Sequence, residues 1–132
     1  MTENKPFSKK EVLRSPQRLE RLEVQRVVEL SLADATITSV LDVGTGTGLF
    51  AEAFSSVVED VAGIDSNPEM IKTAQGLVPS VRFQLGSAEE IPSSDDEYDL
   101  VFLGHMLHEA HSPSSVLLEA KRCSKKRVVV LE

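Results

Sequence analysis

Apolar residues gather in five short stretches of the chain, which we interpret as β-strands at residues 39–43, 61–64, 81–85, 99–103 and 127–131. Four of these stretches are mostly apolar, as strands are when both faces of a parallel sheet are covered. The stretch at 81–85 alternates apolar and polar residues, which is the period of a strand. The pattern therefore predicts a sheet of five strands.

Helical patterns separate these strands. Ser15-Pro16, Asn67-Pro68 and Ser112-Pro113 each place a capping side chain before a proline, which is typical of a helix start. We expect the first helix to extend to about Leu32, and a further helix to span residues 46–58. The apolar face of that further helix would be formed by Leu49, Phe50, Ala53, Phe54 and Val57. Strands that alternate with helices predict a doubly wound α/β fold, with helices on both faces of a mainly parallel sheet.

The length of 132 residues suits a single domain. Residues 1–14 show neither helical nor strand periodicity, so we expect a flexible N-terminal arm there and one domain at residues 15–132. No repeat or low-complexity segment interrupts that domain.

The net charge of −7 is unevenly distributed, because residues 34–109 carry fourteen acidic and only two basic residues. An acidic middle disfavours long nucleic acid as a partner, since phosphate contacts supply most of that affinity. No apolar run approaches the ~18 residues of a membrane span, and the first residues lack the apolar core of a signal peptide, so we expect a cytoplasmic protein. Cys123 is the single cysteine, which excludes an internal disulfide and a cysteine-based zinc site.

The candidate chemistry begins where the first strand ends, in the segment Val40-Leu41-Asp42-Val43-Gly44-Thr45-Gly46-Thr47-Gly48. Glycines in such a loop permit a tight turn and the close approach of a ligand. Their spacing differs from the G-x-G-x-x-G fingerprint of dinucleotide sites, and Asp42 favours a cationic or amine-bearing ligand over a pyrophosphate.

Polar residues follow the other strands at the same edge of the sheet, where ligands of such folds bind. Asp65 ends the second strand, and its carboxylate can accept hydrogen bonds from both hydroxyls of a ribose. The segment 86–92 (Gly-Ser-Ala-Glu-Glu-Ile-Pro) follows the third strand, and 98–109 forms the fourth strand and its exit.

These four segments, in this order, resemble the motifs of the class I S-adenosylmethionine-dependent methyltransferases, especially the small-molecule group of the ubiquinone and menaquinone biosynthesis type. The resemblance covers residues 38–131. It implies a Rossmann-like five-stranded sheet of order 3-2-1-4-5, S-adenosylmethionine as cofactor, S-adenosylhomocysteine as product, and a small-molecule methyl acceptor. The cofactor-binding residues that it implies are Asp42, Gly44, Thr45, Gly46, Asp65, Ser66, Ser87, Ala88, Gly104 and His105.

The chain departs from the family pattern at three places. Ser87 replaces the usual aspartate that accepts from the adenine amine, which predicts a weaker contact there. The basic segment 121–127 replaces a glycine-containing turn before the fifth strand, which leaves the shape of that connection open. The family sheet continues beyond a fifth strand, so we expect the chain to be a fragment of a longer protein. We also expect residues 128–131 to form a sheet edge that self-associates, accepts a partner strand or frays.

The histidines and the alternative functions stay open at this stage. His105 and His108 are weak candidates for a general base, although packing and capping are the more ordinary roles of such histidines, and we expect no metal site. Glu89 is a further weak ligand candidate in an acidic loop. A cofactor-binding module without transferase activity, an interaction subunit, and a nicotinamide-dependent enzyme remain alternatives, the last disfavoured by the glycine spacing.

Overall fold

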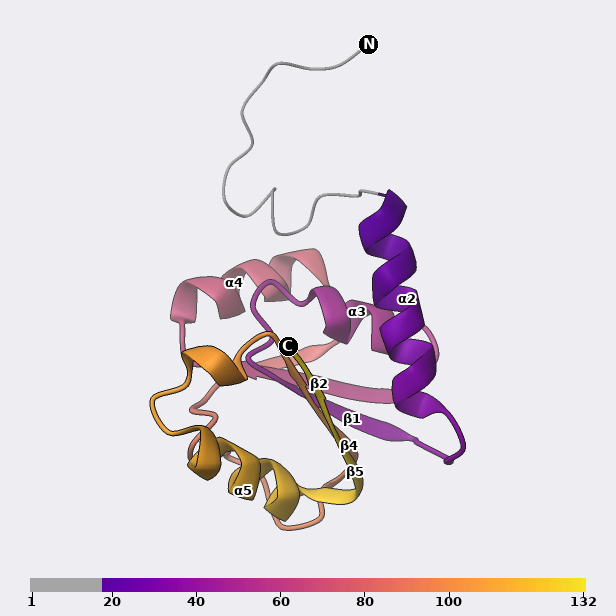
Figure 1. Cartoon of the computed structure of the whole chain (residues 1–132). Helices are drawn as coiled ribbons and strands as arrows, with labels where there is room; N and C mark the ends of the chain where they lie inside the picture. The colour runs from indigo at the N-terminus through magenta and orange to yellow at the C-terminus, as the bar shows by residue number, and fades with distance from the viewer. Residues whose placement is uncertain (1–17) are drawn as a thin grey trace.

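The computed structural model describes residues 18–132 (Figure 1). Five parallel strands form one sheet in the order β3-β2-β1-β4-β5. Their bounds are Ser39–Val43 (β1), Asp60–Asp65 (β2), Arg82–Leu85 (β3), Tyr98–Gly104 (β4) and Ser124–Leu131 (β5). The number of strands, their direction and their order confirm the predicted fold.

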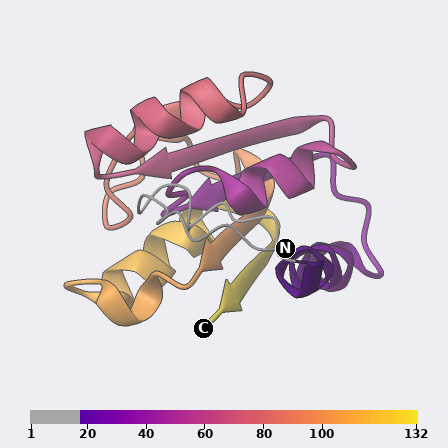
Figure 2. The same ribbon diagram turned by 90° about the horizontal axis from the view of Figure 1, so that it is seen from above.

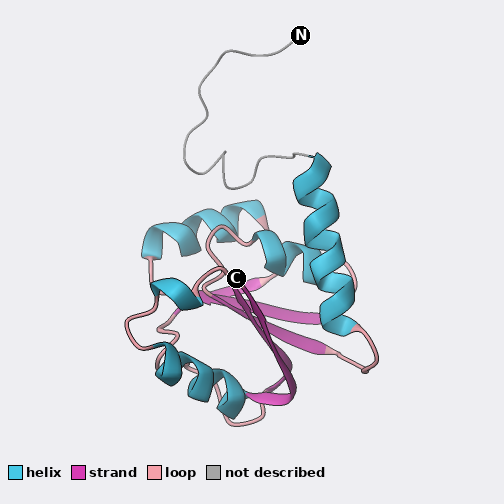
Figure 3. Cartoon of the chain, viewed as in Figure 1, coloured by secondary structure: helices cyan, strands magenta, loops and turns pink. Residues whose placement is uncertain are grey.

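Helices cover both faces of the sheet, as Figure 3 shows. Helices α2 (Arg18–Leu32), α3 (Leu49–Ser55) and α4 (Pro68–Leu77) lie over one face, and α5 (Pro113–Cys123) lies over the other. A short 3-10 helix, η1 (Leu107–Glu109), follows β4. In the view from above, α4 lies over the β3 side of the sheet, whereas α2 lies toward the β5 side (Figure 2).

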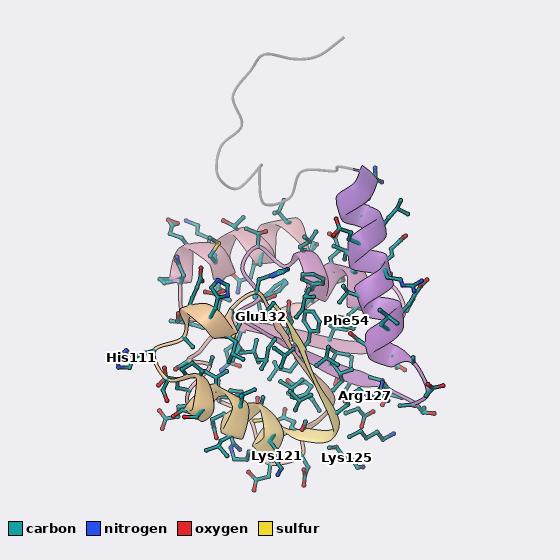
Figure 4. All side chains as sticks on the ribbon, in the orientation of Figure 1. Phe54, His111, Lys121, Lys125, Arg127 and Glu132 are labelled. Carbon is teal, nitrogen blue, oxygen red and sulfur yellow. The ribbon has the colours of Figure 1, made fainter. Side chains whose placement is uncertain are left out.

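Two apolar clusters hold these layers together. One lies beneath α2, α3 and α4, where Phe54 points toward the sheet and meets Phe102 with the ring centroids 5.2 Å apart (Figure 4). The other lies between α5 and the opposite face, and it contains Val116, Ala120 and Cys123. Because successive strand residues alternate between the two faces, the apolar runs of β1 and β4 supply both clusters.

The helix predicted at residues 46–58 is shorter in the structure, where it spans Leu49–Ser55. Gly46 and Gly48 have positive φ angles of 59° and 89°, so the chain is not helical until Leu49. The helix ends at Ser55, and Val57 is 65% exposed, so its assignment to the apolar face was wrong. The predicted arm and the Ser15-Pro16 helix start lie outside the described residues, although α2 does extend to Leu32 as expected.

The basic segment before the fifth strand contains no separate turn. Helix α5 ends at Cys123, and β5 begins at the next residue, Ser124. Arg127 donates hydrogen bonds to the carbonyl oxygens of Ser31 (2.8 Å) and Ala33 (2.7 Å) at the end of α2. β5 therefore begins at Ser124 rather than at the predicted residue 127, and Arg127 ties it to the end of α2. No helix within residues 18–132 is long and apolar enough to cross a membrane.

Candidate functional site

A cleft of about 520 Å³ opens at the carboxyl ends of the strands. This volume lies in the range of small-molecule sites, and the place is where ligands bind to doubly wound sheets. The lining residues come from the loops after β1, β2, β3 and β4 and from α4, η1 and α5. They are Gly44, Gly46, Asp65, Ser66, Asn67, Met70, Gly86, Ser87, Ala88, Glu89, His105, Met106, Glu109, Ala110, His111 and Val116.

The glycine loop forms the wall of the cleft above β1. Gly44 has a φ of 74°, and a Cβ on it would lie 2.9 Å from the Met106 side chain. Gly46 also has a positive φ, but a Cβ on it would meet no atom within 4 Å. The backbone at Gly46 is therefore open to a ligand, and the loop conformation that exposes it favours glycine.

Asp65 connects the glycine loop to the start of α4. Its Oδ2 accepts a hydrogen bond from the N–H of Gly46 (2.9 Å), and its Oδ1 accepts one from the N–H of Asn67 (2.9 Å). Each carboxylate oxygen has further acceptor capacity, so both can also receive hydroxyl groups from a ligand. The half-buried carboxylate is held in place by the backbone on both sides.

Asp42 lies behind the glycine loop and does not line the cleft. It is only 3% exposed, and its Oδ2 accepts a hydrogen bond from the hydroxyl of Thr45 (2.8 Å). Burial raises the pKa of Asp42 to about 7, and the charge of Asp65 adds to this, whereas the hydrogen bonds from Thr45 and the Ala51 backbone oppose it. Any contact between Asp42 and a ligand would have to pass through the loop or a water molecule.

The loop after β3 forms the opposite end of the cleft. The hydroxyl of Ser87 accepts a hydrogen bond from the N–H of Glu89 (3.1 Å), which closes a local turn. The side chain of Glu89 reaches α5, where its Oε2 accepts from the N–H of Ser112 (3.1 Å). Ser112 also caps α5, because its hydroxyl accepts from the N–H of Ser115.

His105 lies at the exit of β4. Its φ of 54° is uncommon for a residue with a side chain, and its N–H donates to the carbonyl oxygen of Leu131 (2.7 Å). The ring centroid lies 6.5 Å from that of Phe50, and the residue lines the cleft. The preceding Gly104 is not among the lining residues.

The other two histidines have different surroundings. His108 lies outside the cleft lining, and its Nδ1 is 2.7 Å from a carboxylate oxygen of Glu132. Glu132 lies beside η1, and His111 points away from the sheet (Figure 4). The described part of the chain contains no group of three or more histidine, cysteine or acidic side chains that could hold a metal ion.

The structure brings together seven of the ten predicted binding residues, namely Gly44, Gly46, Asp65, Ser66, Ser87, Ala88 and His105. Asp42, Thr45 and Gly104 lie outside the lining. Sequence reasoning did not single out Met70, Met106 or Val116, which add apolar walls. The position of Met106 in the loop after β4 was a usable signal, because that loop lies at the carboxyl end of the strand. Val116, in contrast, is one of several apolar positions of a helix.

Comparisons with known proteins place the chain in a family. A model of the methyltransferase domain matches residues 41–131. YcgJ of Bacillus subtilis, an uncharacterized methyltransferase, is 35% identical over 92 residues, which are 66% of this chain and 36% of that protein. A demethylmenaquinone methyltransferase of Renibacterium salmoninarum is 32% identical over 95 residues, 70% of this chain and 40% of that protein.

Solved structures agree with these relatives. The crystal structure of a SAM-dependent methyltransferase from Aquifex aeolicus superposes with a TM-score of 0.75 and 28% identity, covering 91% of this chain and 69% of that chain. The chain belongs to the methyltransferase domain family. The chain spans less than half the length of the Bacillus subtilis and Renibacterium salmoninarum relatives.

Proposed function

We propose that this chain binds S-adenosylmethionine in the cleft and takes part in methyl transfer to a small-molecule acceptor. The observation that carries the proposal is the pairing of the open backbone at Gly46 with the carboxylate of Asp65, 2.9 Å from the Gly46 N–H. A loop without a Cβ at this point admits a ligand against the backbone, and the adjacent acceptor-only carboxylate suits a vicinal diol.

The residues present fit the cofactor along the strand ends. Asp65, above β2, would accept from the ribose hydroxyls, while Gly44 and Gly46, above β1, would lie against the amino-acid portion. The N–H of Ala88, above β3, has no acceptor among the described residues, so it is available to a ring nitrogen of the base. Ser66, beside Asp65, would lie against the same base.

The cofactor supplies the activated methyl group on its sulfonium, and the protein contributes proximity and alignment. His105 lines the cleft at the exit of β4, where it can hold a proton that leaves the acceptor. His108 is directed to Glu132 and lies outside the lining, so the structure favours His105 of the two candidates for a general base.

The charge of the cleft also bears on the acceptor. Asp65, Glu89 and Glu109 line it, and no lysine or arginine is among the described residues of the lining. Such a wall repels polyanions, so we infer a neutral or cationic small molecule and no nucleic acid.

We expect S-adenosylhomocysteine to bind this chain and NADH not to bind, because the glycine spacing and the acidic wall do not suit a pyrophosphate. Isothermal titration calorimetry with both ligands measures this directly. Tight NADH binding without S-adenosylhomocysteine binding would contradict the proposal. Cofactor binding without turnover on a panel of small acceptors would identify a binding module rather than an enzyme.

We also propose that two copies of the chain associate through the edge of the sheet. β5 is the last strand in the sheet order, and Val130 is 42% exposed on it. An apolar strand with unpaired backbone groups on one side is a template for another strand.

We expect Val130→Lys to weaken self-association about ten-fold or more, because a lysine at an edge opposes strand pairing. Sedimentation velocity over a concentration series measures the effect. Val57→Lys is the matched control, since Val57 is 65% exposed in the turn after α3, away from β5. A strictly monomeric wild-type chain, with the amides of residues 127–131 fully protected from hydrogen exchange, would contradict the prediction.

A further inference from the structure

We propose that Glu132 is a positioning residue, which fixes the exit of β4 and thereby shapes one end of the cleft. That end would receive the amino-acid portion of S-adenosylmethionine, so this assignment rests on the proposed function. Glu132 follows β5 and is not among the lining residues, so it would act through the residues that it holds.

The exit of β4 forms a large part of the cleft wall. It includes the short helix η1, and it begins at His105, whose φ of 54° is uncommon for a residue with a side chain. Such a conformation persists only where the surrounding structure holds it, so the position of this wall depends on contacts from outside the segment. The five lining residues that this segment supplies are His105, Met106, Glu109, Ala110 and His111.

Two consecutive residues at the end of β5 supply contacts of this kind. The carbonyl oxygen of Leu131 accepts a hydrogen bond from the N–H of His105 (2.7 Å). The Oε2 of Glu132 accepts from the N–H of Leu107, and its Oε1 accepts from the N–H of His108, both at 3.2 Å. The same Oε1 lies 2.7 Å from Nδ1 of His108. The Glu132 side chain therefore provides three of these four contacts.

Glu132 takes the place of a local cap that η1 lacks. The first N–H groups of a helix have no acceptor within the helix, and the side chain of the N-cap residue usually accepts from them. The N-cap residue here is Met106, which makes no side-chain cap hydrogen bond. Within residues 18–132, no other carboxylate accepts from the N–H of Leu107 or of His108. Loss of the Glu132 carboxylate would therefore leave the start of η1 free to shift.

A shift of the β4 exit would reach the glycine loop through Met106. The two segments are in close contact, because a Cβ on Gly44 would lie only 2.9 Å from the Cγ of Met106. Closely packed groups transmit small displacements to one another. Gly44 would lie against the amino-acid portion of the cofactor, whereas Asp65, which would hold the ribose, is fixed by other backbone groups. Glu132 should therefore affect the amino-acid end of the cleft and not the ribose end.

The test compares two ligands by calorimetry on the full 132-residue chain. S-Adenosylhomocysteine has the amino-acid portion, whereas 5′-methylthioadenosine keeps the base, the ribose and the sulfur but has a methyl group in its place. We expect Glu132→Ala to weaken the binding of S-adenosylhomocysteine about five-fold or more, the equivalent of about one hydrogen bond. The affinity for 5′-methylthioadenosine should change by less than about two-fold.

A conservative variant and a control make the result specific. Glu132→Gln keeps one oxygen that can accept from η1, so its affinity for S-adenosylhomocysteine should lie between those of wild type and Glu132→Ala. This variant also provides the comparison of the two ligands if the alanine variant does not fold. Glu59→Ala removes an exposed carboxylate before β2, at the other end of the sheet and outside the lining, and should change neither affinity.

Hydrogen exchange at single amides tests the contact itself. We expect the amides of Leu107 and His108 to exchange about ten-fold or more faster in Glu132→Ala than in wild type, because both lose their acceptor. Exchange in Glu132→Gln should be intermediate. Unchanged exchange in both variants would show that Glu132 does not hold η1, and it would overturn the assignment.

The ligand comparison has equally definite outcomes. An equal loss of affinity for both ligands would show a general structural role of Glu132 and would overturn the assignment. Unchanged affinity for S-adenosylhomocysteine, with faster exchange at η1, would also overturn it while leaving the proposed function intact. Failure of the wild-type chain to bind S-adenosylhomocysteine would instead overturn the proposed function, and this assignment with it.

Discussion

Replacing Asp65 by alanine should weaken the binding of S-adenosylhomocysteine about 10- to 150-fold, with the fold retained. The loss corresponds to about 1.5–3 kcal/mol, the usual contribution of hydrogen bonds to a charged group. This loss of binding free energy has two sources, because the carboxylate would accept from the ribose hydroxyls and also accepts from the N–H groups of Gly46 and Asn67. Calorimetry gives the affinity, and thermal denaturation shows that the chain is folded.

Two further variants make this result specific. Asp60→Ala removes a carboxylate from the opposite end of the same strand, where it pairs with Arg82 on the surface, and should leave the affinity unchanged. Asp65→Asn keeps one oxygen and should give an intermediate loss. An affinity for S-adenosylhomocysteine that is the same in Asp65→Ala and in the wild-type chain would show that the ribose is held elsewhere.

The sheet was predictable because the local sequence of each strand indicates a strand. The apolar runs that became β1, β2 and β4 are short and mostly buried, as burial on both faces demands. The run of β5 has a similar composition, but it lies at the edge of the sheet and none of its residues is fully buried. The strand order came from the resemblance of four motifs to a known family. The starts of α4 and α5 were also predictable from the sequence, since Asn67 and Ser112 cap their N-termini as expected.

The departures have tertiary causes. The helix expected at residue 46 begins at Leu49 because the glycine loop is shaped by contacts with β2, including hydrogen bonds from Gly44 and Thr45 to Ile64. In α2, Leu22 and Leu30 recur at helical spacing in the sequence, yet both are more than half exposed while Val28 and Ser31 are buried, which depends on where α3 and the sheet lie. Periodicity shows that a helix has an apolar side, but not which positions the neighbours cover.

The sequence predicted that the candidate site lies at the carboxyl ends of the strands. It did not predict the orientation of the side chains or their long-range contacts. Asp42 lies at the expected position in the sequence, yet its carboxylate faces Thr45 behind the loop rather than the cleft. The link from Glu89 to Ser112 joins residues 23 positions apart, and that from Arg122 to Ile91 joins residues 31 apart. No local pattern encodes such pairs, so they emerge only when the loop and helix pack together.

The buried Asp42 should make the stability of the chain fall as the pH rises toward neutrality. Its pKa is about 7 in the folded chain, against an ordinary value of 3.8, so between these values the folded chain holds a proton that the unfolded chain releases. The corresponding stabilisation is fully present below about pH 4 and is lost as the pH rises through 7. Above that pH, the chain contains a buried charge that costs about 4 kcal/mol at most.

Asp42→Asn isolates this contribution, because asparagine is neutral at every pH and resembles the protonated acid in shape. We expect the free energy of unfolding of the variant, relative to wild type, to rise by about 2.5 kcal/mol between pH 5 and pH 8. Urea denaturation at the two pH values measures it. Asp96→Asn is the control, because Asp96 is exposed and its φ of 53° suits asparagine equally well, so its difference from wild type should stay constant.

A difference between Asp42→Asn and wild type that does not change with pH would show that Asp42 is ionised throughout this range in the folded chain. That outcome would require a stronger stabilisation of the carboxylate than the hydroxyl of Thr45 and the N–H of Ala51 provide. A positively charged ligand above the loop favours the ionised form, since opposite charges attract most strongly away from water. Adding S-adenosylmethionine, whose sulfonium is cationic, should therefore reduce the pH dependence that distinguishes wild type from Asp42→Asn.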